Sequence, residues 1–178
     1  VRFVSDNKIK YPEISITARA AGTCMAGGPL SHSIILDTTR YMNRIISVTK
    51  VTPYELTPRF TKNHTITVTG AAVVEPGVFY RDFEKEAAKQ NLLLPSFTAS
   101  KSINAIGGMV GNNSGGELTL QYGKTEEYVS EVSIVLTDGN EYVVSPLTRK
   151  ELRGKVALGG FEGKLYAELS LLLEKEEA

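Results

Sequence analysis

Two glycine-rich stretches, about eighty residues apart, constrain this chain more than any other feature of its sequence. The first runs from Arg19 to Gly28 (RAAGTCMAGG) and the second from Ile106 to Gly116 (IGGMVGNNSGG), and each adjoins an apolar segment. Glycine lets a backbone approach a ligand closely and turn its N–H groups toward an anion. Two such loops indicate a ligand too long for one loop, with a phosphate-bearing part and a flat part, and a dinucleotide fits that description.

The first loop matches neither of two common phosphate-binding motifs. Gly22 and Gly27 have the spacing that opens a triphosphate-binding loop, but Gly28-Pro29 stands where that motif needs Lys and Ser or Thr. The dinucleotide fingerprint G-x-G-x-x-G is absent as well. Two interpretations remain open: a backbone nest that binds a pyrophosphate through N–H groups alone, and a plain tight turn between two strands.

The second loop has five glycines within ten residues, interleaved with Asn112, Asn113 and Ser114. Because glycine carries a large ordering cost, a purely structural turn rarely uses so many. The asparagine amides can donate and accept hydrogen bonds at once, which suits the edge of a polar heterocycle. A flexible surface loop is the alternative for this segment.

Composition excludes several classes of protein. The chain has 178 residues, enough for one domain or two small lobes, and its 20 basic and 20 acidic residues give a net charge of zero. Nucleic acid is therefore not expected as the main partner. The single cysteine indicates a reducing compartment. The sequence shows neither a signal peptide nor an apolar run of the roughly 20 residues that span a bilayer.

The predicted elements are strand-rich with few helices. Strands are predicted at 14–18, 34–37, 44–48, 66–74 and 129–136, and a hairpin turn at Asp138-Gly139 leads into 141–144. Helices are predicted at 78–94, which ends before Pro95, and at 163–177, and residues 50–64 are expected to form a loop or ragged hairpin. This order favours an α+β fold with two sheets. The helical opening at Val1 and the uncapped closing helix predict a fragment of a longer protein.

Five segments, in this order, resemble the FAD-binding domain of the FAD-linked oxidases, the vanillyl-alcohol-oxidase or p-cresol-methylhydroxylase (PCMH) type. They are Arg19–Thr23 with Gly27-Gly28, Ile35–Arg44, Val74–Val78, Ile106–Gly116 with Tyr122-Gly123, and Val135–Gly139. The resemblance covers about residues 14 to 145. It is greatest to bacterial D-lactate and glycolate dehydrogenases, including those fused to iron–sulfur modules.

The resemblance implies an α+β, PCMH-type fold in which two α+β lobes hold FAD between them, truncated here at both ends. The FAD-binding domain would comprise residues 1–146, with lobe one at about 1–80 and lobe two at about 95–146. Residues 147–178 would be a helical segment leading to a missing C-terminal part. The family's catalytic histidine and acidic residues would lie beyond residue 178, so the catalytic residues stay unassigned and the piece alone is expected to be inactive.

The resemblance also implies the cofactor-binding residues. The first loop would wrap the pyrophosphate mainly through backbone N–H groups, and the segment from Pro95 to Gly116 would line the flavin and ribityl side. The residues expected at the site are Ala21, Gly22, Thr23, Cys24, Met25, Gly27, Pro95, Ser102, Ile106, Gly107, Gly108, Asn112 and Gly115. Some relatives attach FAD through a histidine in the first loop or a cysteine in the second. Neither is present here, so FAD is expected to be non-covalent.

The function implied by the resemblance is that of an FAD-dependent oxidoreductase acting on the CH–OH group of a 2-hydroxy acid such as D-lactate or glycolate. The expected partners are that substrate and an iron–sulfur electron-transfer module, without nucleic acid or a membrane span. The expected location is the cytoplasm, or a membrane reached through partners. Two alternatives stay open: the flavin domain of a sugar-nucleotide reductase or a molybdenum hydroxylase, and a non-catalytic module that binds a nucleotide or a partner.

Several residues attract a functional interpretation on weak grounds. His32 and His64 lack the spacing of metal ligands and are interpreted as neutral loop histidines, so no metal site is expected. Cys24 is interpreted as a small apolar filler. The glycosylation sequons at Asn63 and Asn112 are interpreted as chance matches. Pro53 and Pro58 lie in a stretch that looks like an insertion relative to the family.

Overall fold

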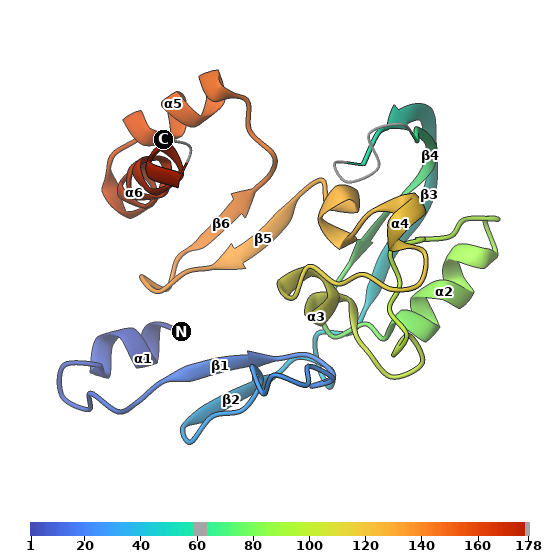
Figure 1. The fold of residues 1–178 in the computed structure, drawn as a ribbon. Helices are drawn as coiled ribbons and strands as arrows, with labels where there is room; N and C mark the ends of the chain where they lie inside the picture. Colours follow the sequence, from blue (N-terminus) through green and yellow to red (C-terminus); the bar gives the residue numbers. More distant parts are fainter. Residues whose placement is uncertain (59–63, 177–178) are drawn as a thin grey trace. The chain divides into compact units, whose positions relative to one another are not determined.

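A computed structural model describes residues 1–58 and 64–176 of the chain. The chain divides into two compact units, whose elements are labelled in Figure 1. The larger unit comprises Asn7–Val129, and the smaller unit comprises Val1–Asp6 together with Ser130–Ala178.

The larger unit begins with a parallel pair of strands, β1 (Ile16–Arg19) and β2 (Ile34–Asp37). Ile16 pairs with Ile34 and Arg19 pairs with Asp37, so both strands end at the same edge of the pair. Parallel strands need a crossover connection of about a dozen residues or more. Residues 20–33, which include most of the first glycine loop, supply that connection.

A long antiparallel hairpin, β3 (Ile45–Leu56) and β4 (Ile66–Val74), supports the core of the larger unit. Helix α2 (Tyr80–Ala88) buries Tyr80, Phe83 and Ala87, which recur at the three-to-four-residue spacing of an amphipathic helix. These side chains form one cluster with Val78, Phe97 and Met109, and the half-buried Ile45, Val48 and Val74 of the hairpin pack against it. The core therefore lies between α2 and the hairpin.

Three short helices complete the larger unit: α3 (Ile106–Gly111), α4 (Thr119–Tyr122) and the 3-10 helix η1 (Thr125–Tyr128). Helix α3 begins just after an isolated bridge between Phe79 and Ala105. The Ile106 N–H donates to the Val78 carbonyl (2.9 Å), and the Met109 side chain is buried in the core. Helix α3 is thus fixed to the core on one side, while Gly108 is exposed on the other.

The smaller unit contains a hairpin and two longer helices. Strands β5 (Val132–Val135) and β6 (Glu141–Val144) pair antiparallel across a turn in which Gly139 has a φ of +76°. Helix α5 (Arg149–Ala157) begins with a capping box formed by Thr148 and Glu151, and α6 (Gly160–Glu176) follows it. Helix α1 (Arg2–Asn7) is tied to the hairpin turn, because Arg2 Nε donates to the Gly139 carbonyl (3.2 Å).

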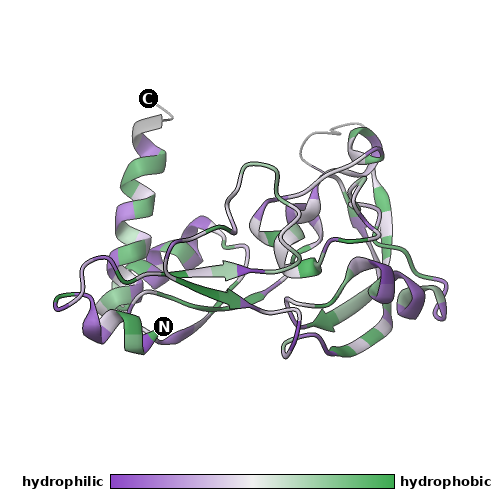
Figure 2. Cartoon of the chain, turned by 90° about the horizontal axis from the view of Figure 1, so that it is seen from below, coloured by the Kyte–Doolittle hydropathy of each residue, from purple (hydrophilic) through white to green (hydrophobic). Residues whose placement is uncertain are grey.

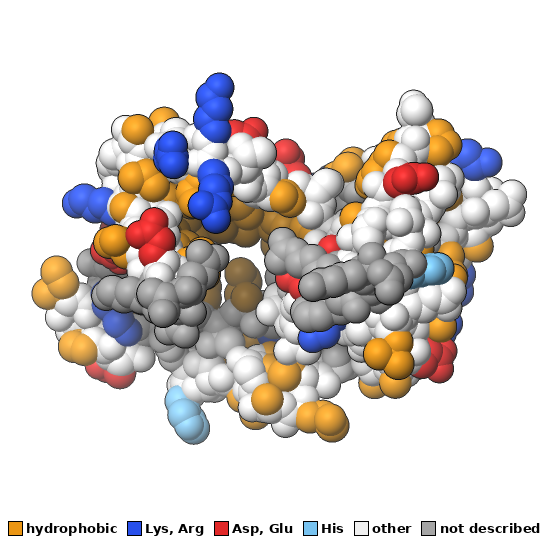
Figure 3. Space-filling model, turned by 45° about the horizontal axis from the view of Figure 1, so that its top comes forward, with side chains coloured by type: hydrophobic (Ala, Val, Ile, Leu, Met, Phe, Trp, Pro, Cys, Tyr) orange, Lys and Arg blue, Asp and Glu red, His pale blue; other side chains and the backbone are white. Residues whose placement is uncertain are grey.

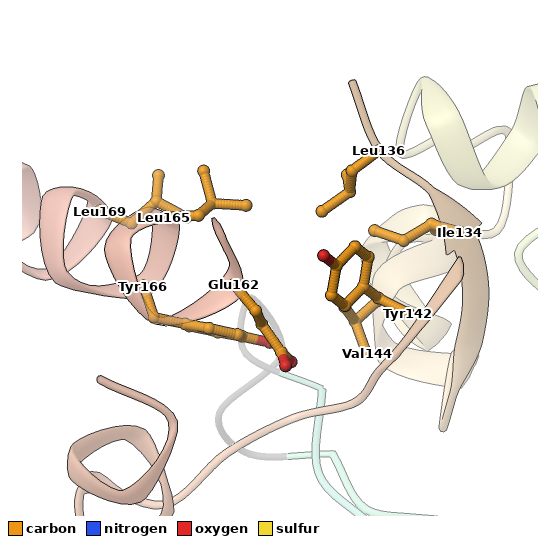
Figure 4. A pocket seen from close by; sticks show the side chains of 8 residues that line it. All are labelled: Ile134, Leu136, Tyr142, Val144, Glu162, Leu165, Tyr166 and Leu169. Carbon is orange, nitrogen blue, oxygen red and sulfur yellow. The ribbon is translucent and has the colours of Figure 1, made fainter. Parts of the chain in front are cut away.

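An apolar pocket of about 160 Å³ lies between the β5–β6 hairpin and α6 in the smaller unit (Figure 4). It is lined by Ile134, Leu136, Tyr142, Val144, Glu162, Leu165, Tyr166 and Leu169. Glu162 is the one acidic residue of this lining, and its carboxylate pairs with Lys155 Nζ (2.6 Å). Figure 2 shows hydrophobic segments recurring along α6, where Leu171, Leu172 and Leu173 are exposed.

Most of the predicted elements are confirmed. The strands at 34–37 and 66–74 have the expected bounds, the first strand begins two residues later than expected, and 129–136 contains the shorter β5. The hairpin turn at Asp138-Gly139 and the closing helix are present, the helix beginning at Gly160. The division of the domain into lobes at about residues 80 and 95 stays a prediction.

Two details of the expected fold are wrong. The described strands form three separate two-stranded sheets, β1–β2, β3–β4 and β5–β6, instead of two sheets. Of the two alternatives for residues 50–64, the described part favours the ragged hairpin, because residues 50–56 continue β3 against β4 with a register shift between Lys50 and Tyr54; residues 59–63 lie outside the described part. The helix predicted at 78–94 ends at Ala88, since Asn91 turns the backbone with a φ of +57° and the Leu92 N–H donates back to the Ala87 carbonyl.

Candidate functional site

The site is built on the edge at which the two parallel strands end. Arg19 closes β1 and Asp37 closes β2, and the first glycine loop and the turn after Asp37 both leave from this edge. Ligands of parallel sheets commonly bind beyond the carboxyl ends of the strands. The Thr38 N–H donates to the Arg19 carbonyl (2.9 Å) and its hydroxyl donates to the same oxygen (3.3 Å), which fixes the start of the loop.

The first glycine loop presents backbone N–H groups that no protein group uses. In the described part of the chain, no backbone N–H from Ala21 to Met25 donates to a protein acceptor. Gly22 and Gly27 have φ values of +70° and +76°, a region that favours glycine. Successive N–H groups around left-handed residues form concave anion sites. The loop therefore has the donors that a diphosphate requires.

The second glycine loop lies against the first. A Cβ built on Gly108 would stand 3.5 Å from the Cβ of Ala20, and nothing else in the described structure would lie within 4 Å of it. Both residues belong to the larger unit, so this contact lies within one compact body. The two loops, far apart in sequence, therefore border one exposed region at Gly108.

The turn Glu75-Pro-Gly77 connects the second loop to the turn after β2. The Gly107 N–H donates to the Pro76 carbonyl (2.8 Å), and the Gly77 N–H donates to the Met42 carbonyl (2.7 Å). A Cβ on Gly77 would overlap the Thr38 carbonyl oxygen, so this turn, the turn after β2 and α3 are in direct contact. The second loop is thereby held at a fixed place beside the first.

An ion pair between Arg44 and Glu75 holds this turn against the residue that precedes β3. Arg44 Nη2 and Nε donate to Glu75 Oε1 at 2.7 and 3.0 Å, and the Arg44 N–H donates to Oε2 at 2.7 Å. These hydrogen bonds hold the pKa of the Glu75 carboxyl below its usual value. The carboxylate therefore stays charged under ordinary conditions and keeps the turn in place.

Two buried polar atoms in the segment that leads to the second loop lack a partner. Ser96 Oγ and Asn104 Oδ1 make no hydrogen bond in the described structure, and their residues are 1% and 4% exposed. Asn104 Nδ2 donates to Thr98 Oγ1 (2.8 Å), so the amide is held on one side only. Buried polar atoms are normally satisfied by protein, water or ligand. The unused N–H groups of the first loop and the open side of Gly108 fit an extended polar cofactor.

The expected site residues do not all lie together. The first loop contains Ala21, Gly22, Thr23, Cys24, Met25 and Gly27. In α3, Gly108 lies against Ala20 of that loop, Gly107 lies against Pro76, and Ile106 packs against the core. Asn112 is the exposed C-cap of α3, and Gly115 lies against Thr119. Pro95 is half-buried beside the core segment, and Ser102 is exposed, its carbonyl accepting from Arg81 (2.6 Å).

Three residues that shape this region were not among the expected site residues, although they lie in segments that carry the resemblance. Ala20 makes the contact between the loops, the N–H and hydroxyl of Thr38 donate to the Arg19 carbonyl, and the Pro76 carbonyl accepts from the Gly107 N–H. The Pro-Gly turn at 76–77 was a detectable signal, because it indicates a tight bend. The unpartnered amide oxygen of Asn104 had no signal in the sequence, since burial is decided by tertiary packing.

The histidines and the cysteine do not form a common centre. Among the described residues, no group of three or more His, Cys, Asp or Glu side chains could hold a metal ion. The His64 ring lies edge-on to the Tyr122 ring at a centroid distance of 6.0 Å, and His32 is exposed in a loop. Asn63 of one sequon lies outside the described residues.

On the face drawn in Figure 3, basic and acidic side chains are interspersed with hydrophobic ones.

Comparison with known families identifies the class of the protein. Residues 7–145 match the family described as an FAD binding domain. Because the match covers well over half of the chain, the chain belongs to this family, and its cofactor is FAD. The expected family and the expected cofactor are confirmed.

Two curated relatives are similar to this chain in sequence. The glycolate oxidase subunit GlcD of Bacillus subtilis is 30% identical over 129 residues, which are 71% of this chain and 24% of that protein. A D-lactate dehydrogenase of Anaerostipes hadrus is 28% identical over 178 residues, which are 96% of this chain and 32% of that protein. The chain thus spans less than a third of the length of either relative.

A solved structure confirms the fold. 6-Hydroxy-D-nicotine oxidase of Arthrobacter nicotinovorans superposes with a TM-score of 0.58 at 24% identity, over 85% of this chain and 28% of that one. The expected α+β, PCMH-type fold is therefore confirmed, with the chain covering part of the domain. None of the helices among the described residues combines the length and the hydropathy that crossing a bilayer requires.

Proposed function

We propose that the chain forms the FAD-binding part of a flavin-dependent dehydrogenase or oxidase that acts on the CH–OH group of a 2-hydroxy acid such as D-lactate or glycolate. The names of the two relatives support this substrate class. The contact between the glycine loops at Ala20 and Gly108 carries the proposal, because one extended cofactor can reach both loops there. When bound, FAD supplies the acceptor for the hydride of the substrate, and the protein supplies orientation and electrostatics.

The larger unit would divide the cofactor between its two loops. The unused N–H groups of Ala21 to Met25, with the turn at Gly27, would hold the diphosphate. The open side of α3 at Gly108 would face the flavin and ribityl part, with Ile106 and Gly107 beside it. The other residues proposed to line that part are Pro95, Ser102, Asn112 and Gly115.

The mode of attachment and the partners belong to the same proposal. FAD would be held without a covalent bond, because the first loop has no histidine and the second has no cysteine. An iron–sulfur module would take up the electrons, as in the dehydrogenases that the sequence resembles. The single cysteine supports a reducing compartment, the cytoplasm.

The proposed activity is tested on the protein expressed from its complete gene. We expect a yellow protein whose flavin colour disappears under anaerobic conditions on addition of D-lactate, glycolate or a longer D-2-hydroxy acid, and persists with L-lactate. The measurement is the flavin absorption band before and after each addition. Colourless protein that FAD cannot reconstitute would contradict the proposal. Bleaching by a nicotinamide cofactor alone would instead indicate a reductase of the same fold.

The place of the cofactor is tested by adding one branched side chain to each loop. Gly108→Val is expected to weaken FAD binding roughly 10-fold or more by occupying the open side of α3, with little effect on folding since only the Ala20 Cβ lies nearby. Gly22→Val is expected to act at least as strongly, because valine is strained at a φ of +70° and its Cβ would meet the Arg19 guanidinium at 2.6 Å.

The matched control for these variants is Gly154→Val in α5, where an added Cβ likewise meets nothing within 4 Å. FAD dissociation constants from titration calorimetry compare the three variants with the unchanged protein. If Gly108→Val and Gly22→Val bind FAD as tightly as the control, the two loops are not the binding site.

A further inference from the structure

We propose that the guanidinium group of Arg19 binds the diphosphate of the cofactor, an inference that rests on the proposed function. Arg19 ends β1 and is the only charged residue of the first glycine loop. Its side chain folds back over the loop, so that Nη2, Cζ and Nε lie 2.6 to 2.8 Å from the position that a Cβ on Gly22 would take. A cation therefore lies beside the segment whose backbone N–H groups have no acceptor.

The positive charge of Arg19 is not taken up by an acid of the protein. Asp37 is its register partner on β2, yet no Arg19 nitrogen lies within 4.0 Å of a carboxylate oxygen in the described residues. Asp37 is satisfied locally instead, because its Oδ1 accepts from the Thr39 N–H (2.9 Å) and the Thr39 hydroxyl (2.6 Å). These bonds, and more weakly the charge of Arg19, lower the pKa of Asp37. The guanidinium donors thus remain available to another anion.

The chemistry of the ligand explains why a guanidinium belongs at this place. A diphosphate carries full negative charges, whereas backbone N–H groups offer only partial positive charges. Arginine can donate two parallel hydrogen bonds to one phosphate, and such charge-assisted pairs are about twice as strong as neutral ones. Arg19 would therefore distinguish FAD from riboflavin, which has the same ring system and no phosphate.

The test compares FAD and riboflavin binding in variants of the protein expressed from its complete gene. Arg19→Gln is expected to weaken FAD binding about 10- to 100-fold and to leave riboflavin binding within about twofold. Arg19→Lys keeps the charge without the planar fork, so an intermediate loss of about 3- to 10-fold is expected. Lys50→Gln on β3, an exposed position, removes the same charge away from the loop and serves as the control. Dissociation constants come from quenching of flavin fluorescence, and circular dichroism verifies that each variant folds.

The outcomes separate this inference from the proposed function. Loss of FAD affinity in Arg19→Gln with unchanged riboflavin affinity supports the assignment. Unchanged FAD affinity, or equal losses for FAD and riboflavin, overturns the role of Arg19 and leaves the site at the loops intact, provided that Gly108→Val still weakens FAD binding. If the unchanged protein does not bind FAD, the proposed function and the role of Arg19 both fall.

Discussion

Replacing Gly77 with valine is expected to destabilise the larger unit by roughly 3 to 5 kcal/mol. A Cβ on Gly77 would overlap the Thr38 carbonyl oxygen and would stand 2.7 Å from the Met42 carbonyl oxygen. Both of these atoms are backbone, so the overlap cannot be relieved by rotating a side chain. The turn at 75–77 would have to move away from the turn after β2, and the hydrogen bond from Gly77 to Met42 (2.7 Å) would be lost. Urea denaturation followed by circular dichroism measures the change in the free energy of unfolding.

The effect of Gly77→Val should reach the cofactor as well, because the neighbouring Pro76 carbonyl anchors Gly107 of the second loop. The matched control is Gly154→Val in α5, since a Cβ there meets nothing within 4 Å and the residue is exposed. A surface change of that kind is expected to alter stability by no more than about 0.5 kcal/mol. If the two variants unfold at the same denaturant concentration, the contacts of Gly77 do not hold the loops together.

Replacing Tyr80 with alanine is expected to cost about 3 to 5 kcal/mol of unfolding free energy. Tyr80 is 0% exposed, and its ring lies 6.0 Å from the rings of both Phe83 and Phe97, measured between centroids. Its hydroxyl donates to the Leu94 carbonyl (2.7 Å), which fixes the segment that follows α2. Burial and, secondarily, the Glu84 charge raise the pKa of this hydroxyl, so it remains a donor. Thermal and urea unfolding of the variant measure the loss.

Tyr80→Phe separates the ring from the hydroxyl. The ring contacts stay in place, and only the hydrogen bond to Leu94 is removed, so a loss of about 1 kcal/mol is expected. A phenylalanine variant as unstable as the alanine variant would show that the hydrogen bond, rather than the packing of the ring, dominates. An alanine variant within about 1 kcal/mol of the unchanged protein would contradict the placement of Tyr80 at the centre of the core.

The sequence predicted the strands better than their partners. A short apolar run located β2 and a β-branched run located β4 with the bounds observed, because local pattern decides whether a segment is extended. Which strands pair is decided by tertiary packing, and so the three separate sheets were not foreseen. Pro53 left a loop and a ragged hairpin open for residues 50–64, and it lies in β3 at the register shift between Lys50 and Tyr54, where the ladder tolerates a residue without an N–H.

The sequence predicted both loops of the site but not the contact between them. Glycine clusters at 19–28 and 106–116 are visible in the sequence, whereas the contact of Ala20 with Gly108 depends on how α3 packs against the core. Pro95 was the visible signal for the end of the helix, whereas α2 ends at Ala88 because Asn91 takes a φ of +57° and the Leu92 N–H donates to the Ala87 carbonyl. The surroundings of Arg19 could not be predicted either, because Asp37 lies opposite it only through the parallel pairing of β1 and β2.

The turn at Glu75-Pro-Gly77 has a thermodynamic consequence for cofactor capture. The turn fixes the second loop to the turn after β2, and Thr38 of that turn bonds to Arg19 at the start of the first loop. The entropy of ordering these segments is therefore lost when the chain folds. Binding then begins from loops that are already arranged, and less of the contact energy is offset by immobilisation. Affinity for the flavin nucleotide should therefore depend on the rigidity of a bend that need not touch it.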